Sequence, residues 1–250
     1  MIDIHSHILY GIDDGPDDVY ESVRLCEMGN EYGIDRAVAT PHITLSDSIG
    51  DFVAVRDRRI ARLSEILKQK DIELQLYPGA ELFVDDEIYY TKKLDSLTIN
   101  GSRYLLVEFD FHNLSPRRLI SYIDEVFRMG YVPIVAHPER YSYMQRDYAL
   151  ADFLSERGAL FQINADSLAG LSGYEEFHLA YRMVRHNCAS FIATDAHSHL
   201  QRKNDMLRLI GSFPPDISRE SLDFMLYEAP SRVLRDSDLP RIHRRRIAIR

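Results

Sequence analysis

Short apolar runs alternate along this chain with longer segments of helical periodicity, and no other feature constrains the fold as strongly. Seven runs are short, mostly apolar and bounded by Gly, Pro or charged residues, as buried parallel strands are. They cover residues 2–5, 35–40, 74–80, 104–109, 132–136, 160–164 and 191–194. Strands that alternate with helices predict an α/β fold built on a parallel sheet.

The clearest helical pattern lies between the fourth and fifth runs, at residues 116–129, where apolar side chains three and four positions apart share one face. Ser115 suits the N-cap, Pro116 the first helical position and Gly130 the residue that ends the helix. Further helical patterns cover residues 17–32, 51–69, 147–157, 174–187, 203–210 and 218–227.

The chain is expected to form a single domain over residues 1–250, because no linker, composition break or internal repeat divides it. Closure of the seven strands into one barrel fits this length, since single barrels of about 250 residues are ordinary. A basic tail is expected from about residue 236 to 250, solvated or else in contact with a phosphorylated partner or an anionic membrane surface. Its arginines are Arg241, Arg244, Arg245, Arg246 and Arg250.

Charge, cysteine content and the N-terminal sequence narrow the functional class. The 30 Lys and Arg against 39 Asp and Glu give a net charge of −9, whereas a general nucleic-acid binder needs a basic surface. Cys26 and Cys188 are too few for a disulfide framework and favour a reducing cytosol. No apolar run approaches the roughly 18 residues of a membrane span, and residues 1–7 lack a signal-peptide pattern. We therefore expect a cytoplasmic enzyme.

Histidines and carboxylates follow six of the seven expected strands. Because the carboxyl ends of parallel strands meet at one rim of a barrel, we expect these side chains to converge. A His-x-His pair on a strand projects both rings to one side, and neutral imidazoles are common metal ligands. Mixed His and carboxylate ligands suit Zn, Mn or Fe, and their number requires two or three ions. The residues are His5, His7, His42, Glu81, Glu108, His137, Asp195 and His197.

Three further residues have both a structural and a functional interpretation. Asp14, in the sequence Asp13-Asp14-Gly15-Pro16, is typical of a turn that caps the next helix, but its closeness to His7 allows a metal role. Arg140 is either a salt bridge at the rim or a phosphate ligand, whose geometry its guanidinium matches. Arg202 could converge on the same rim, although it is expected to open a helix rich in charge.

Several common catalytic motifs are absent from the sequence. Neither cysteine is followed by the Cys-x5-Arg pattern of cysteine-dependent phosphatases, and no phosphate-binding Gly-rich loop or Gly-x-Ser-x-Gly motif occurs. Covalent catalysis and nucleotide hydrolysis lose support, which favours metal-assisted hydrolysis.

These motifs resemble the polymerase and histidinol phosphatase (PHP) superfamily. More narrowly, they resemble its bacterial protein-tyrosine phosphatases, which belong to capsule and exopolysaccharide loci. The match runs in order from residue 1 to about 235, and only the segment 44–55 has no counterpart. The matching segments are Met1-Ile2-Asp3-Ile4-His5-Ser6-His7, Gly11-Ile12-Asp13-Asp14-Gly15-Pro16, Ala39-Thr40-Pro41-His42, Gly79-Ala80-Glu81, Leu106-Val107-Glu108-Phe109, Ile134-Val135-Ala136-His137-Pro138-Glu139-Arg140 and Ala193-Thr194-Asp195-Ala196-His197.

The resemblance implies a distorted (β/α)7 barrel with three divalent metal ions, usually manganese, with iron or zinc as alternatives. The first ion would bind His5, His7, Glu81 and Asp195. The second would share Glu81 and add Glu108 and His137, and the third would bind Asp14, His42 and His197. Arg140 and, less securely, Arg202 match arginines that bind phosphate.

The function implied is hydrolysis of phosphotyrosine on a protein, with the tyrosine-rich tail of a membrane tyrosine autokinase as the substrate. A small-molecule phosphatase, such as one acting on histidinol phosphate, would use the same ligands and stays open. A DNA exonuclease or polymerase accessory domain is disfavoured by the acidic charge, and a non-enzymatic binding module by the intact ligand pattern. An oligomer is compatible with the sequence.

Overall fold

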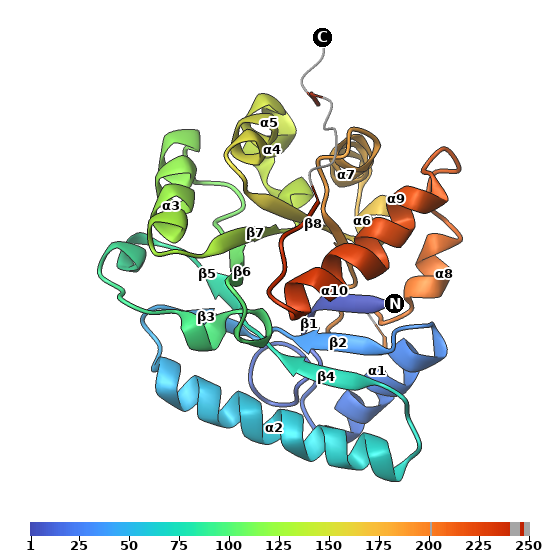
Figure 1. Cartoon of the computed structure of the whole chain (residues 1–250). Coiled ribbons are helices and arrows are strands. Elements are labelled where there is room, and N and C mark those ends of the chain that lie inside the picture. Colours follow the sequence, from blue (N-terminus) through green and yellow to red (C-terminus); the bar gives the residue numbers. More distant parts are fainter. Residues whose placement is uncertain (201, 241–245, 248–250) are drawn as a thin grey trace.

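The computed structural model describes residues 1–200, 202–240 and 246–247, and all the strands in this part of the chain run parallel (Figure 1). One sheet has the order β1-β2-β4 and the other β3-β5-β6-β7-β8-β9. The strands are β1 (Ile2–Ser6), β2 (Arg36–Ala39), β3 (His42–Thr44), β4 (Gln75–Pro78), β5 (Glu81–Phe83), β6 (Tyr104–Glu108), β7 (Val132–Ala136), β8 (Leu160–Asn164) and β9 (Phe191–Ala193).

Two of the seven predicted strands are each broken into two short strands, which the sequence analysis did not predict. The runs 35–40 and 74–80 contain β2 and β4, and β3 and β5 then continue them beyond the bend. The first halves pair in one sheet, Ala39 opposite Pro78, and the second halves pair in the other, His42 opposite Glu81. Proline and glycine interrupt strands, so Pro41 and Gly79 favour the bends at these points.

The bend at Gly79 is fixed from two sides. A Cβ atom on Gly79 would lie 2.7 Å from Val38 Cγ1, so the two strands approach too closely there for any side chain. From the outside, the buried Arg56 donates hydrogen bonds to the carbonyl oxygens of Gly79 (2.9 Å) and Ser96 (2.8 Å). These contacts satisfy backbone groups that the broken strand leaves free.

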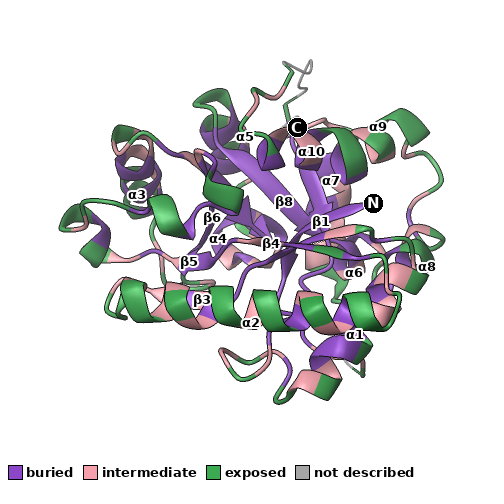
Figure 2. Cartoon of the chain, turned by 60° about the horizontal axis from the view of Figure 1, so that its bottom comes forward, coloured by how far each residue is buried: buried purple, intermediate pink, exposed green. Residues whose placement is uncertain are grey.

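Helices cover the outside of the sheets and turn their exposed faces to solvent, while the strands are buried (Figure 2). The predicted caps of α3 are confirmed: the Ser115 side chain accepts from Arg118 N, Pro116 opens the helix, and Gly130 follows it with a φ of +93°. The α-helices are α1 (Val19–Glu31), α2 (Ile49–Gln69), α3 (Pro116–Arg128), α4 (Ser142–Arg146), α5 (Ala149–Glu156), α6 (Ala165–Leu168), α7 (Tyr174–Arg185), α8 (Met206–Ile210), α9 (Arg219–Asp223) and α10 (Ala229–Leu234).

Short 3₁₀ and π segments fill several connections. They are η1 (Asp86–Tyr89), η2 (Asp95–Leu97), η3 (Ile99–Gly101), η4 (Pro138–Arg140) and the π-helical η5 (Phe224–Glu228). The predicted helix at 218–227 therefore ends too early, since α9, η5 and α10 follow one another as far as Leu234. The segment 44–55 comprises the end of β3, a turn and the start of α2.

The C-terminal segment contacts the domain where it is described. Arg246 forms an ion pair with Glu156 (3.4 Å), and the buried Ile247 donates from its backbone N–H to Asp152. The other arginines of the predicted basic tail, at 241, 244, 245 and 250, lie outside the described residues. No helix in the described part of the chain is long and apolar enough to cross a membrane.

Candidate metal centre

The structure brings all nine predicted ligands together, at the carboxyl ends of strands and at the bends between β2 and β3 and between β4 and β5. His5 lies in β1 and His7 just after it, His42 and Glu81 open β3 and β5, and Glu108 ends β6. His137 follows β7, Asp195 and His197 follow β9, and Asp14 lies in the loop between β1 and α1. In four sets, every residue offers an atom within 4.8 Å of the others. The sets are His7, Asp14, His42 and His197; His5, His7 and Glu81; His5, His137 and Asp195; and His42, Glu81 and Glu108.

Glu81 is the centre of this arrangement and is fully buried. Its Oε2 lies 3.1 Å from each of three imidazole nitrogens, His5 Nε2, His7 Nε2 and His42 Nδ1. Its Oε1 lies 2.9 Å from His137 Nε2. Burial alone would raise the pKa of Glu81, but the surrounding histidines, His5 above all, hold it well below its usual value.

The donor atoms fit a divalent cation. Although Glu81 Oε2 is buried and surrounded by nitrogens, it forms no hydrogen bond with any described residue, and neither does the buried His197 Nε2. Buried polar atoms without hydrogen-bond partners are costly and rare, so two such atoms in one cluster indicate that the cluster binds a ligand. Imidazole nitrogens with carboxylate oxygens form the ligand set that Zn, Mn and Fe prefer.

Protons occupy part of this space in the metal-free protein. Burial, reinforced by the charge of Glu81, raises the pKa of Glu108 to about 8. Burial lowers the pKa of His7, but its partners Asp13 and Glu81 outweigh burial and raise it to about 10. Both groups therefore hold a proton at neutral pH, and a bound cation would displace these protons because metal ligands must be deprotonated.

Asp13 contributes to the centre, which the sequence analysis missed. Its Oδ2 accepts from His7 Nδ1 (2.7 Å) and from the backbone N–H of His42 (3.1 Å), so it holds one ligand ring and the start of β3. The helix cap expected from this loop is supplied instead by Asp18. The sequence feature that points to this role is the pair of adjacent aspartates, because both contact ligands of the same cluster. Asp13 contacts His7, and Asp14 contacts His197.

The loop that carries both aspartates lies directly against β1. A Cβ atom on Gly15 would lie only 2.3 Å from the carbonyl oxygen of His7, so this position requires glycine. The carboxylate of Asp14, which is 64% exposed, reaches 3.2 Å from His197 Nε2 and 3.6 Å from His42 Nε2. Asp14 therefore closes the cluster on its solvent side.

The Asp195-x-His197 pair does not have extended backbone geometry. Asp195 has a φ of +51°, which places it in the left-handed region, and His137 has a φ of +31°. Asp195 N donates to His5 O, and His7 N donates to Ala196 O, both at 2.9 Å, so this turn is bound to β1. As a result the His197 ring stacks on the His7 ring, with centroids 3.9 Å apart. Left-handed non-glycine residues concentrate at functional sites.

Two arginines converge on one carboxylate of the cluster. Arg140 Nη1 lies 3.6 Å from Asp195 Oδ2, and Arg202 Nη2 hydrogen-bonds to the same oxygen. Their side chains are 31% and 34% exposed, so both guanidiniums remain accessible from the mouth of the site. Arg202 does not open a helix as expected, because it lies in a loop with a φ of +48°, before α8. Arg140 also stacks over the Phe111 ring, 4.7 Å from its centroid.

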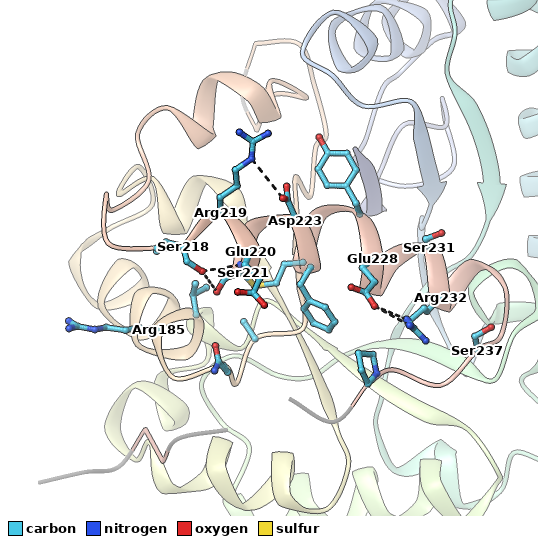
Figure 3. A pocket seen from close by; sticks show the side chains of 18 of the residues that line it. Arg185, Ser218, Arg219, Glu220, Ser221, Asp223, Glu228, Ser231, Arg232 and Ser237 are labelled. Carbon is cyan, nitrogen blue, oxygen red and sulfur yellow. Dashed lines mark hydrogen bonds and ion pairs between the residues drawn. The ribbon is translucent and has the colours of Figure 1, made fainter. Parts of the chain in front are cut away.

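A large cavity elsewhere in the molecule contains none of the predicted metal ligands. It measures about 1610 Å³ and lies along α9, η5 and α10, and its lining includes none of the nine predicted ligands (Figure 3). Charged side chains along it pair with one another, Arg219 with Asp223 in α9 (3.8 Å) and Arg232 of α10 with Glu228 of η5 (3.0 Å). The residues predicted to bind metal or phosphate therefore lie outside this cavity.

Comparison with known proteins gives a consistent result over most of the chain. The family model described as capsular polysaccharide synthesis, CpsB/CapC, matches residues 1–235. The tyrosine-protein phosphatase YwqE of Bacillus subtilis (strain 168) is 32% identical over 240 residues, covering 96% of this chain and 93% of its own length. The putative tyrosine-protein phosphatase CapC of Staphylococcus aureus is 37% identical over 206 residues, covering 81% and 79%.

Solved structures agree with these relatives. One belongs to a study of YwqE from Bacillus subtilis and CpsB from Streptococcus pneumoniae, described as unique metal-dependent tyrosine phosphatases. It matches with a TM-score of 0.84 and 28% identity, covering 98% of this chain and 99% of its own. The phosphotriesterase homology protein of Escherichia coli, at 11% identity and a TM-score of 0.56 over 92% of this chain and 97% of its own, shares the fold.

Proposed function

Because the chain belongs to the CpsB/CapC family of capsular polysaccharide synthesis, we propose that it is a metal-dependent tyrosine phosphatase that acts on a protein in capsule or exopolysaccharide synthesis. One observation carries the proposal. A buried cluster of imidazoles around Glu81 Oε2 shares the carboxylate of Asp195 with two accessible guanidiniums. The proposed metal ligands and phosphate ligands are thus adjacent, as metal-assisted hydrolysis of a phosphate ester would use them.

The proposed architecture is a distorted (β/α)7 barrel in which the two sheets form one wall. The bent strands support it, because β2 leads into β3 and β4 into β5 across the boundary between the sheets. A parallel bridge between Ser6 and Ala196 supports it at the other side, where the end of β1 meets the segment after β9.

The proposed cofactors are three divalent ions, with manganese first and iron or zinc as alternatives. We assign His5, His7, Glu81 and Asp195 to one ion, Glu81, Glu108 and His137 to the second, and Asp14, His42 and His197 to the third. The four sets of neighbouring side chains described above agree with this assignment in part. His7 belongs to two of these sets, one with His5 and Glu81 and one that contains Asp14. Ions bound there would supply Lewis-acid chemistry and a lowered pKa for water.

The chain's own residues bind and orient the phosphoryl group. The carboxylates of the cluster would repel a phosphate dianion, and Arg140 and Arg202 offset this repulsion from the accessible side of Asp195. Their planar guanidiniums match the non-bridging oxygens, so they stabilise the charge that builds up in the transition state. A tyrosine leaving group has a pKa near ~10, so it needs less protonation than an alkyl alcohol does.

The proposed substrate is a tyrosine-rich tail of a membrane tyrosine autokinase, and the proposed location is the cytoplasm. The names of the relatives support a phosphotyrosine substrate. The low cysteine content of the sequence supports the location.

Turnover of a phosphotyrosine peptide and of histidinol phosphate, at equal concentration with manganese-loaded protein, tests this function. We expect a clear preference for the peptide and loss of both activities on chelation. A preference for histidinol phosphate would contradict the assigned substrate class while retaining the metal centre.

A further inference from the structure

We propose that Gln162 and Asn164 of β8 are positioning residues that orient two of the metal ligands, His5 and Asp195. This inference rests on the proposed function, since it presupposes a metal centre. It starts from an exception in the sequence pattern: the run 160–164 is the one predicted strand that no predicted ligand follows.

The position of β8 explains why its side chains reach the centre. It lies beside β7 (Figure 1) and pairs with β9 on its other side, with Gln162 opposite Ala136 and Asn164 opposite Ala193. Its carboxyl end is therefore flanked by the ends of the strands that lead to His137 and Asp195. Gln162 and Asn164 are two residues apart and share one face of the strand, and both are buried.

Gln162 determines which nitrogen of His5 is free to bind a cation. Gln162 Oε1 lies 2.7 Å from His5 Nδ1, and an amide oxygen can only accept, so Nδ1 carries the proton. In the neutral ring the lone pair is then on the opposite nitrogen, Nε2, which faces Glu81 Oε2 at 3.1 Å and Asp195 Oδ1 at 3.4 Å. A hydrogen bond at one ring nitrogen selects the metal-binding tautomer at the other.

Neighbouring groups fix the orientation of the Gln162 amide. Its Nε2 donates to Asn164 Oδ1 (2.8 Å), while Oε1 accepts a second, longer bond from the backbone N–H of His137 (3.4 Å). Reversal of the amide would place its NH₂ group against a backbone donor and its oxygen against the oxygen of Asn164. The amide therefore presents its oxygen to His5.

Asn164 extends the same chain of hydrogen bonds to the second ligand. Its Nδ2 donates to Asp195 Oδ2 (2.8 Å), and its backbone N–H donates to Glu139 Oε1 (2.8 Å), next to Arg140. Both amides are neutral, so they orient His5 and Asp195 without adding charge to a crowded cluster. Removal of such supporting contacts typically lowers metal affinity about 10–100-fold.

Manganese binding to the metal-free full-length protein, measured by calorimetric titration, tests the inference without any use of activity. Gln162→Met keeps the volume of the side chain but removes its acceptor and donor, and Asn164→Ala removes the contact with Asp195. The matched control is Ile163→Val on the same strand, because Ile163 is buried in the main hydrophobic core. A second readout is the Nδ1–H proton signal of His5 in ¹⁵N-histidine-labelled, zinc-loaded protein.

We expect Q162M and N164A to bind manganese about 10–100-fold more weakly than the wild type, with I163V binding normally. We also expect the His5 Nδ1–H signal to be slowly exchanging in the wild type and lost in Q162M. Wild-type affinity in Q162M, or an equal loss in I163V, would overturn the inference. If Q162M does not fold, N164A decides by the same criterion. Failure of the wild type to bind manganese would contradict the proposed metal centre itself.

Discussion

At the scale of single residues, the centre depends on partners that hold its ligands in place. His7 shows this most clearly: its Nδ1 is bound to Asp13, so its Nε2 faces Glu81 Oε2 at 3.1 Å. Asp13 also accepts from the backbone of His42 and of Gly15. One buried carboxylate thus couples a ligand ring, the start of β3 and the loop that carries Asp14.

Replacement of Asp13 by alanine is therefore expected to lower metal affinity about 10–100-fold, although Asp13 is not itself a predicted ligand. Calorimetric titration with manganese measures the effect. Asp17→Ala is the matched control, because Asp17 carries the same charge on the same loop but is exposed. Equal affinities of both variants would show that Asp13 does not position His7.

Arg140 belongs to the phosphate-binding side of the site, so its loss should separate turnover from metal binding. We expect Arg140→Ala to lower kcat/KM for a phosphotyrosine peptide on the order of 10²-fold while manganese affinity changes little. The exposed Arg146, on α4, provides the control as Arg146→Ala. Unchanged turnover in R140A would contradict the role assigned to this arginine.

At the scale of elements, the bends that convert β2 into β3 and β4 into β5 place His42 and Glu81 opposite each other. Sequence patterns predict the longer strands well, because each is a run of apolar residues between turn-forming residues. Three-residue strands such as β3 and β5 are too short to show a period of two. Their existence depends on pairing between segments distant in the sequence, which no local pattern records.

The close approach of the two strands at the Gly79 bend can be tested by measuring stability. Gly79→Ala would place a Cβ atom 2.7 Å from Val38 Cγ1 and 3.2 Å from Thr40 Cγ2. Overpacking of this kind costs about 1–3 kcal/mol, so we expect denaturant unfolding to show a lower free energy of unfolding. Gly50→Ala in α2 is the control, since a Cβ there meets nothing within 4 Å and alanine favours helices. Equal stability of G79A and the wild type would show that the strands can separate without cost.

In the candidate site, too, local sequence patterns predicted some residues and missed others. Eight of the nine ligands could be proposed because histidines and carboxylates at strand ends are unusual chemistry in a regular position, whereas Asp14 was implied only by the family resemblance. Gln162, Asn164 and Asp13 could not be proposed in the same way, since amides and turn aspartates are common without any site. The left-handed backbone at Asp195 was also missed, because it depends on hydrogen bonds to β1.

At the scale of the whole molecule, the fold concentrates like charges at one rim. Glu81, Glu108 and Asp195 are buried near one another, and the molecule as a whole carries a charge of −9. Without cations, protons on His7 and Glu108 and the nearby guanidiniums balance these carboxylates. Bound divalent ions should therefore stabilise the entire domain.

Chelation is expected to lower the thermal midpoint of the protein, and manganese is expected to restore it. An ion at 100 times its dissociation constant stabilises the folded state by about 2.7 kcal/mol per site. Differential scanning calorimetry with and without chelator measures the shift. Sodium or magnesium salts at the same ionic strength control for screening, and an identical midpoint in all conditions would contradict a metal centre that is coupled to folding.

We propose that the nine clustered side chains form the metal centre that enables phosphotyrosine hydrolysis. The most direct measurement titrates manganese into chelated protein while bound ions and the hydrolysis of a phosphotyrosine peptide are followed in the same samples. We expect no turnover without bound ions, and turnover that rises as the metal sites fill. Hydrolysis that persists at full rate in protein shown to contain no metal would contradict it.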